Sequence, residues 1–197
     1  MEDREKINAA EPADVFARER LSAKRYGHTL RVANAAEDLA RVHGLDRGRA
    51  RLAALLHDAA REMPSEEFLG LADSWNLPVG QPERESPKLL HGPVAAELAR
   101  RELGIEDGAV LDAIRDHTTG RPGMDSLSLV LYVADKIEPA RDYPSVERLR
   151  RLARHDLRGA AAESLRRSIA HNEERGRPTH PASIETLGWL EKAEEGA

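Results

Sequence analysis

The chain has 197 residues and a formal net charge of −5, with 40% hydrophobic but only 4% aromatic residues. This length suits one domain with a sizeable core, and a core built mainly from Leu, Ala, Val and Ile favours helices over a β-sandwich. Because the chain has no cysteine, disulfides and thiolate metal sites are excluded, and any bound metal must be held by imidazole and carboxylate groups.

The apolar spacing predicts helices along the whole chain, at about 12–21, 26–43, 46–63, 65–75, 91–103, 107–117, 126–137, 145–154, 156–174 and 183–194. Asp46 and Ser65 are expected to cap two of these helices, and Gly44 and Gly104 follow the ends of two others. Residues 1–10 are expected to form a frayed, charged lead. The Pro-rich stretch 77–90 is expected to be a loop.

The opening residues and the distribution of apolar residues bear on where the protein is expected to reside. The opening residues are charged and lack an apolar h-region, and no run of 18 apolar residues occurs. We therefore expect a cytoplasmic, soluble protein without membrane association. The acidic net charge argues against general binding to duplex nucleic acid, and the oligomeric state stays open.

The stretch from Leu55 to Arg61 places His57 and Asp58 at the edge of an apolar helical face. An unpaired ionised carboxylate there costs on the order of several kcal/mol, so something cationic should lie opposite it. Adjacent helical residues point about 100° apart, which lets both side chains reach one point off the helix edge. The simpler alternative is an exposed pair of polar residues.

Four more potential ligands lie at helix ends or in apolar runs: His28, His91, His117 and Asp135. Asp135 follows the most apolar helical run, and its neighbour Lys136 is not expected to face it, so a metal is the better partner. His117 would equally bond the last carbonyls of its helix. His43, His155 and His171 are expected at the surface. His180 would contact a metal ligand without binding the metal itself.

Four imidazoles and two carboxylates from separate helices, with Asp58 able to bridge, suit two divalent ions a few Å apart. The softness of these ligands allows Fe, Mn, Co, Ni or Zn. The sequence contains no Gly-rich phosphate loop, Walker lysine, nucleophile elbow or internal repeat. The histidines and carboxylates must therefore carry the chemistry.

The sequence resembles the HD-domain metal-dependent phosphohydrolases, whose signature is His, then His-Asp, then Asp. More narrowly, it is similar to the YqeK family of symmetrical bis(5'-nucleosyl)-tetraphosphatases. The similarity covers about residues 15–190 and lies in five stretches: Arg25–Val32, Leu55–Asp58, Leu90–Ala95, Ala113–Met124 and Tyr132–Arg141.

This resemblance implies an all-α HD-domain helical bundle, a single domain over residues 1–197, with a di-iron centre. It also implies hydrolysis of diadenosine tetraphosphate, or a related dinucleoside polyphosphate, to two ADP. One metal would then be held by His28, His57, Asp58 and Asp135, and the other by His91, His117 and the bridging Asp58. His57 and Asp58 would be the catalytic pair. Many HD proteins carry Lys at the position of Arg61, and a guanidinium differs from an ammonium as a phosphate contact.

A hydroxide that bridges the two metals is expected to attack an inner phosphorus. Candidate substrate contacts are Arg25, Arg61, Thr118, Thr119, Gly120, Arg121 and Arg141. The stretch from Thr118 to Arg121 would equally form a plain turn. Residues 141–177 hold ten Arg against six Asp or Glu, which fits either a phosphate-facing surface or a solvated helix face.

Two alternatives to this function remain open. Another HD phosphohydrolase, such as a nucleotide monophosphatase or a cyclic-dinucleotide phosphodiesterase, would use the same site. A nucleotide-sensing module would bind without turnover, although the complete ligand set argues against it. Product analysis with a panel of dinucleoside polyphosphates separates these functions.

Overall fold

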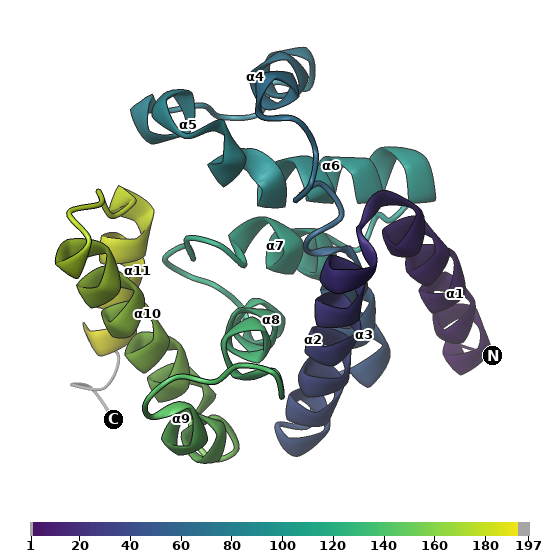
Figure 1. The fold of residues 1–197 in the computed structure, drawn as a ribbon. Coiled ribbons are helices and arrows are strands. Elements are labelled where there is room, and N and C mark those ends of the chain that lie inside the picture. Colours follow the sequence, from purple (N-terminus) through teal and green to yellow (C-terminus); the bar gives the residue numbers. More distant parts are fainter. Residues whose placement is uncertain (1, 193–197) are drawn as a thin grey trace.

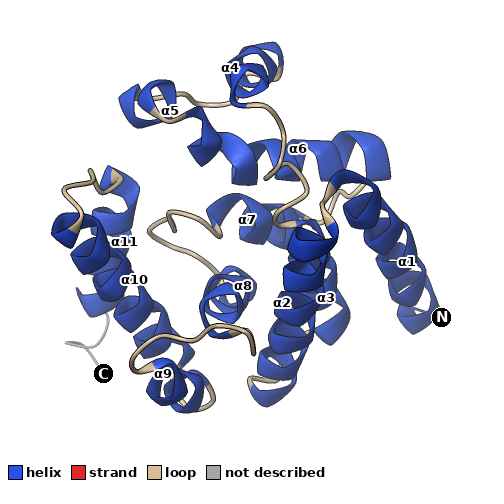
Figure 2. Cartoon of the chain, in the orientation of Figure 1, coloured by secondary structure: helices blue, strands red, loops and turns tan. Residues whose placement is uncertain are grey.

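The structure is a computed structural model that describes residues 2–192, with side chains from residue 10 onward. This part of the chain contains eleven α-helices, one 3₁₀-helix and no strand, which confirms the all-α prediction (Figure 2). The elements are α1 (Glu2–Arg20), α2 (Ala23–Val42), α3 (Arg47–Leu56), α4 (Ser65–Ser74), α5 (Gln81–Glu85), η1 (Pro87–Leu90), α6 (His91–Leu103), α7 (Gly108–Asp116), α8 (Ser126–Ile137), α9 (Val146–Ala153), α10 (Leu157–Glu174) and α11 (Pro181–Lys192).

Helix α8 lies at the centre of the molecule and packs against α2, α7 and α10 (Figure 1). Helices α3 and α1 cover α2 on one side, and α9 and α11 pack on α10 on the other. Helices α4 to α6 lie above α7 in Figure 1. Because α8 is enclosed on several sides, nearly all of its residues are buried, which explains its continuous apolar sequence.

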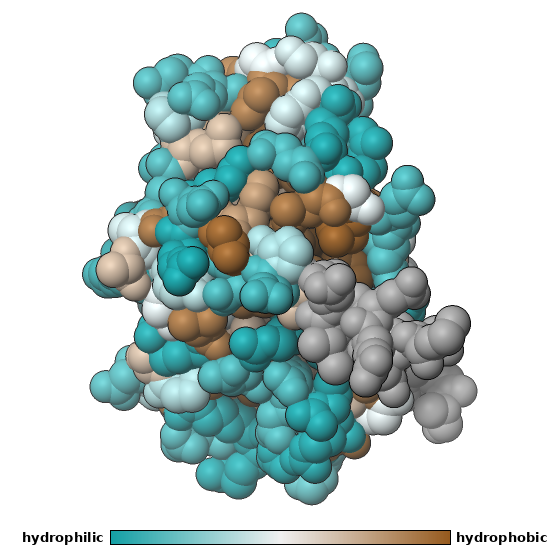
Figure 3. All heavy atoms as spheres, turned by 90° about the vertical axis from the view of Figure 1, so that its right-hand side faces the viewer, coloured by the Kyte–Doolittle hydropathy of each residue, from teal (hydrophilic) through white to brown (hydrophobic). Residues whose placement is uncertain are grey.

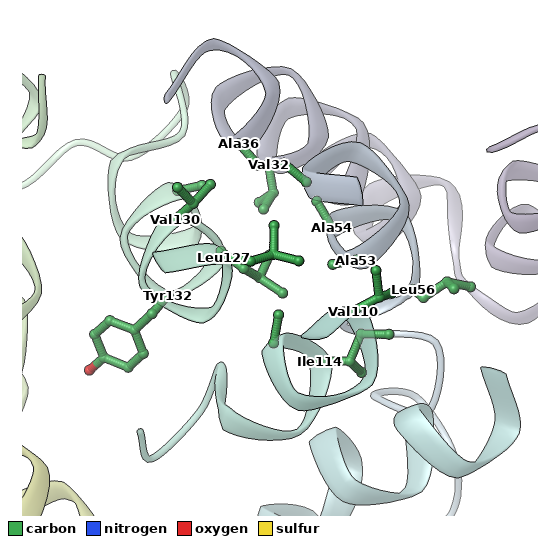
Figure 4. Packing of buried hydrophobic residues seen from close by; sticks show 14 of the residues in the cluster. Val32, Ala36, Ala53, Ala54, Leu56, Val110, Ile114, Leu127, Val130 and Tyr132 are labelled. Carbon is green, nitrogen blue, oxygen red and sulfur yellow. The ribbon is translucent and has the colours of Figure 1, made fainter. Parts of the chain in front are cut away.

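The core at the meeting point of α2, α3, α7 and α8 combines branched and small side chains (Figure 4). Val32 and Ile114 are fully buried, and Ala36 and Ala53 let the helices approach closely. Tyr132 is also buried, but its hydroxyl points away from the other labelled residues in Figure 4. Helix α8 therefore faces the core on one side and α10 on the other.

Aspartate side chains cap several helices by accepting hydrogen bonds from backbone N–H groups. The carboxylate of Asp46 accepts from Arg49 N at 3.0 Å, as predicted, and that of Asp125 accepts from Ser128 N at 2.7 Å. Gly104, with φ of 65°, ends α6 in the left-handed conformation that glycine adopts at low cost. These caps fix where the helices of the centre begin and end.

Two predicted irregular segments are helical. The expected frayed lead at 1–10 is wrong for residues 2–10, which belong to α1. Proline is most common in the first turn of a helix, so the helix was predicted to start at Pro12. In the structure Pro12 lies inside α1, which starts at Glu2. The loop predicted at 77–90 contains α5 and η1, each of which carries a proline in its first turn.

Three predicted helix ends also differ from the structure. Helix α3 ends at Leu56, so His57 and Asp58 lie in the turn that follows it. The residue before α4 is Pro64, and no side chain caps this helix, so the cap predicted at Ser65 is wrong. The last helix starts at Pro181 rather than at 183, and its predicted end at 193–194 lies outside the described residues.

No helix within the described residues is both long and apolar enough to cross a membrane. The face that carries α1 is largely hydrophilic, with apolar groups gathered near its middle (Figure 3). Pro12, Val15, Phe16 and Leu103 line a shallow groove of about 420 Å³ between α1 and the end of α6.

Candidate metal centre

Three of the four candidate histidines are oriented by carbonyl groups at helix ends. His57, His91 and His117 each directly follow the last residue of a helix, α3, η1 and α7 respectively. Each Nδ1 lies 2.6–2.7 Å from the carbonyl oxygen three residues earlier, that of Ala54, Lys88 or Ile114. The last carbonyls of a helix lack partners within it, so they are free to accept from these imidazoles. With Nδ1–H donated, each Nε2 carries a lone pair that faces the centre.

His28 requires a different partner because it lies inside α2, where the helix itself uses the nearby carbonyls. Its Nδ1 lies 3.2 Å from Oε1 of Glu138, which directly follows α8. Arg31 Nε and the Ala140 N–H donate to Oε2 of Glu138, at 2.7 and 2.8 Å. Glu138 thus holds His28 with Nε2 toward Asp135, whose Oδ1 is 3.1 Å away.

Sequence reasoning missed Glu138. Glu138 directly follows an apolar helical run and precedes Pro139, and this position could have indicated a buried carboxylate. A buried carboxylate needs a cationic or N–H partner. The sequence does not reveal that this partner lies 110 residues away in α2.

Asp58 lies between two groups of imidazoles. Its Oδ1 is 3.4 Å from Nε2 of His91 and 3.7 Å from Nε2 of His117. Its Oδ2 is 3.4 Å from Nε2 of His57 and 3.9 Å from Nε2 of His28. Two sets of potential ligands therefore share Asp58, one with His28 and His57 and one with His91 and His117, and the ligand atoms of each set lie within 4.8 Å of one another.

The Nε2 atoms that face the centre are better suited to binding a cation than to hydrogen bonding with one another. Nε2 of His91 and Nε2 of His117 are 3.0 Å apart, yet both Nδ1 atoms are already donors, so two lone pairs face each other. Nε2 of His57 is buried without any hydrogen-bond partner among the described residues. The Thr118 hydroxyl, 3.2 Å from both His91 Nε2 and His117 Nε2, can donate to only one of them. Buried acceptors without donors are costly, whereas bound metal ions would satisfy them.

At Asp58 and His117 the electrostatics favour the forms that bind metals. Burial alone would raise the pKa of Asp58, but His57, His117 and His91 hold it well below its ordinary value. Burial lowers the pKa of His117 to about 4. Burial also lowers the pKa of His57, but Asp58 outweighs this effect, and the net rise indicates that positive charge is favoured beside the carboxylate. An ionised Asp58 and a neutral His117 are the forms that coordinate metals.

The centre opens into a cavity of about 280 Å³, referred to below as the metal cavity. Its cationic lining residues are Arg25, Arg61, Lys136 and Arg141. Arg25 Nη1 lies 3.1 Å from Asp58 Oδ2, and Arg141 Nη2 lies 2.7 Å from Asp135 Oδ1. Lys136 Nζ lies 2.8 Å from Asp135 Oδ2, so the expectation that these neighbours do not meet is wrong. The flexible lysine stem bends back along the last turn of α8.

The predicted substrate contacts separate into two sets. Arg25, Arg61, Thr118 and Arg141 line the metal cavity. Thr119 lies next to it, in the lining of a second cavity described below.

The other two predicted contacts lie outside both cavities. Gly120 has φ of 71°, and a Cβ atom there would lie 2.8 Å from Cγ2 of Thr186 in α11. Arg121 Nη2 pairs with Asp116 at 3.1 Å and with Asp112 at 3.3 Å. Both residues therefore have structural partners away from the metal cavity.

The remaining histidines lie away from the centre. Nε2 of His43 bonds the carbonyl of Ala153 at 2.7 Å, so this residue is half-buried rather than at the surface. His155 and His171 are exposed, as predicted. His180 pairs with Glu83 at 2.8 Å and accepts from the Ala182 N–H, and within the described residues it makes no hydrogen bond to a candidate ligand. The supporting role expected for it is therefore wrong.

A second and larger cavity of about 1000 Å³ adjoins the metal cavity. Arg61 and Thr118 belong to the lining of both cavities. One wall of the larger cavity comes from residues 81–89, and the other comes from α10 and the segment before α11. The His180–Glu83 pair connects these two walls.

Comparisons with known proteins agree with this geometry. A family model described as the HD domain matches residues 25–140. The chain is similar to two proteins named symmetrical bis(5'-nucleosyl)-tetraphosphatase. That of Bacillus subtilis is 39% identical over 180 residues, covering 91% of this chain and 96% of the relative. That of Halalkalibacterium halodurans is 40% identical over 170 residues, covering 86% and 90%.

A solved structure has the same fold. The crystal structure of a Clostridium acetobutylicum protein, described as a predicted HD superfamily hydrolase involved in NAD metabolism, superposes with a TM-score of 0.90. The two sequences are 34% identical, and the match covers 93% of this chain and 97% of the other.

Proposed function

The chain belongs to the HD domain family, and we propose that it is a metal-dependent symmetrical bis(5'-nucleosyl)-tetraphosphatase that hydrolyses diadenosine tetraphosphate to two ADP. The observation that carries this proposal is the position of Asp58 between two sets of imidazoles, each of which is complete enough to hold a divalent ion. A pair of ions so placed suits a phosphoanhydride substrate. The names of the relatives specify which phosphoanhydride is cleaved.

In the proposed centre, His28, His57, Asp58 and Asp135 hold one ion, and His91, His117 and Asp58 hold the other. Iron is the proposed metal, while imidazole and carboxylate ligands also allow Mn, Co, Ni or Zn. When bound, two such ions would lower the pKa of a water molecule and offset the charge that develops on the phosphoryl oxygens. The protein's own contribution is to hold the ligand atoms in place before substrate arrives.

Cationic side chains of the metal cavity are proposed to hold the phosphate chain. Arg61 is the best placed, because it has no carboxylate partner among the described residues and its Nη1 lies 3.3 Å from Nδ1 of His91. Arg25 and Arg141 already pair with Asp58 and Asp135, and they can turn part of the guanidinium toward a phosphate. Thr118 adds a hydroxyl, whose Oγ1 lies 3.2 Å from Nε2 of both His91 and His117.

Symmetrical cleavage requires an inner phosphorus to lie over the centre. The bond between the two inner phosphates then breaks, the oxygen of water joins the attacked phosphorus, and the other ADP leaves with the bridging oxygen. No redox step or co-reactant is needed. Which phosphorus lies over the centre depends on how the cations and the neighbouring cavity seat the substrate.

Product analysis tests this proposal directly. Anaerobically purified protein, loaded with iron, should convert diadenosine tetraphosphate to ADP alone, as measured by anion-exchange chromatography. In oxygen-18 water, only one of the two ADP molecules from each turnover should carry the label.

Each other outcome has a distinct meaning. Equal amounts of ATP and AMP would refute symmetrical cleavage, and hydrolysis of AMP but not of the dinucleotide would indicate a nucleotidase. Tight binding of ADP without turnover under any of these metals would indicate a sensor. Less than about half an equivalent of any transition metal, with no activation by added Fe, Mn or Co, would refute the metal centre itself.

A further inference from the structure

The larger cavity has the size and position of a binding site for part of the substrate. Its volume of about 1000 Å³ lies at the upper end of the range for small-molecule sites. It meets the metal cavity at Arg61 and Thr118, which line both. A phosphate chain that passes these two side chains would therefore continue from one cavity into the other.

The lining of the larger cavity combines apolar surface with a few hydrogen-bonding groups, as nucleoside recognition requires. Leu89 and Pro178 contribute apolar surface from opposite walls. Asn172 of α10 donates from Nδ2 to Thr179 Oγ1 at 3.3 Å, and its Oδ1 has no partner among the described residues. This amide oxygen is therefore available to a donor on a ligand, such as an exocyclic amino group or a ribose hydroxyl.

The charge of this lining suits an anion, because Arg61, Lys88 and Arg177 outnumber its one glutamate, Glu85. Lys88 on one wall and Arg177 on the other have no ion-pair partner within the described side chains. Most arginines of this chain pair with carboxylates, and the net charge of the protein is −5. Two unpaired cations that face the same cavity therefore indicate a site for an anionic ligand. Arg177 belongs to the Arg-rich stretch for which the sequence left a solvated face and a phosphate-facing surface open.

We propose that the larger cavity takes one nucleoside diphosphate half of the substrate, with the nucleoside beside Asn172 and the phosphates held by Arg177 and Arg61. This inference rests on the proposed function and extends it to residues outside the signature motifs. The half held in this cavity fixes how many phosphates reach the metal centre. Residues of α10 and of the segment before α11 thus determine which phosphorus is attacked.

The two walls form this cavity through a contact far from the centre. Nδ1 of His180 accepts from the Ala182 N–H at 3.1 Å, so Nε2 carries the proton and donates to Glu83 Oε1 at 2.8 Å. Ser183 Oγ, in the first turn of α11, donates to the Thr119 carbonyl at 2.9 Å and holds the start of this helix on the turn that follows His117. The cavity is therefore built before ligand arrives, which favours binding.

Binding of two probes to the metal-loaded, full-length protein tests this inference. ADP should occupy both cavities, whereas inorganic diphosphate should occupy the metal cavity alone. By titration calorimetry, Asn172→Ala should raise the Kd for ADP about tenfold and leave the Kd for diphosphate within about twofold, whereas Arg177→Ala, which removes a phosphate contact, should also raise the Kd for ADP about tenfold. Arg175→Ala is the matched control, because Arg175 is exposed on the same turn but does not line the cavity, and it should change neither constant.

The outcomes separate this inference from the proposed function. Unchanged ADP affinity in both cavity variants, or equal weakening of ADP and diphosphate in Asn172→Ala, would overturn the nucleoside site. Failure of the wild-type protein to bind ADP more tightly than diphosphate would overturn it too. If ADP binds as expected while diadenosine tetraphosphate yields no ADP, the cavity assignment stands and the proposed activity is wrong.

Discussion

At the scale of single residues, the centre depends on where each imidazole places its proton. Three histidines use the unpaired carbonyls at the ends of their own helices, so their orientation is fixed locally. His28 depends on Glu138, a residue far away in the sequence. The four ligands therefore differ in how they respond to mutation.

The shared carboxylate gives the first prediction. Asp58→Ala should lose both metal ions, because Asp58 faces both sets of imidazoles, whereas His117→Ala should lose mainly one. Elemental analysis of protein prepared anaerobically measures this, and circular dichroism confirms that each variant is folded. Full metal content and turnover in Asp58→Ala would disprove the bridging role.

The second prediction concerns Glu138. Glu138→Gln keeps the shape of the side chain but removes the charge that orients His28 and raises its basicity. Metal affinity at the set containing His28 should fall about 10–100-fold, measured by competition with a chelator. Glu102→Gln on α6 is the control, because its exposed carboxylate also pairs with an arginine, Arg20 of α1, and makes no contact with a candidate ligand among the described residues. Equal affinities in the two variants would mean that Glu138 does not position His28.

At the scale of elements, α8 links the core to the site. Its N-terminus is fixed by Asp125 and its C-terminus delivers Asp135, Lys136 and Glu138. Because α2, α7 and α10 surround it, a shift along its axis would move these three side chains together.

The third prediction tests the cap of this helix. Asp125→Ala removes the acceptor for the Ser128 N–H and should lower the free energy of unfolding by about 1 kcal/mol. Asp125→Asn keeps an acceptor and should lose much less. Urea unfolding of the metal-free protein measures both values. An equal loss in the two variants would show that charge, and not the cap bond, stabilises α8.

The fourth prediction follows from the contact between α5 and the segment before α11. Burial would raise the pKa of Glu83, but His180 and nearby N–H groups lower it below its ordinary value. A depressed pKa means that the ionised form stabilises the fold above the ordinary pKa of about 4.3, and that this contribution is lost as pH falls through the folded-state pKa.

Glu83→Gln should therefore cost about 1 kcal/mol near pH 7 and much less below pH of about 4. Urea midpoints of wild type and variant across this pH range measure the difference. Glu85→Gln on the same helix is the control, since Glu85 is exposed. A difference that stays constant with pH would contradict the assignment to Glu83.

At the scale of the whole molecule, the sequence predicted the features that depend on local residue patterns. Apolar spacing predicted the all-α fold and most helix limits. The family signature predicted the six residues that the structure brings to one centre, which are His28, His57, Asp58, His91, His117 and Asp135. The sequence predicted that His57 and Asp58 lie on a helix, because the apolar pattern continues past Leu56. In the structure the backbone hydrogen bonds beyond Leu56 join residues three apart, as in successive turns, and not four apart as in an α-helix.

What the sequence did not predict depends on contacts between distant segments. Glu138 gains its role only because α2 lies beside the end of α8. Asn172 and Arg177 reach the larger cavity because α10 packs on α8, and nothing in their local pattern differs from a solvated helix face. The Pro-rich stretch at 77–90 was predicted as a loop, yet Pro82 and Pro87 each lie in a first turn, where proline is tolerated.

The unpaired cations of the two cavities have a consequence for the speed of encounter. Arg61, Lys88 and Arg177 outnumber Glu85 in the lining of the larger cavity, on a protein that is negative overall. Such a local excess of positive charge is expected to attract a polyanion from solution. Raising the ionic strength from about 0.05 to 0.5 M shortens the Debye length and should lower kcat/KM for diadenosine tetraphosphate about tenfold, with little change in kcat. Initial-rate kinetics measure this, and a kcat/KM insensitive to salt would show that the acidic remainder of the surface cancels the attraction.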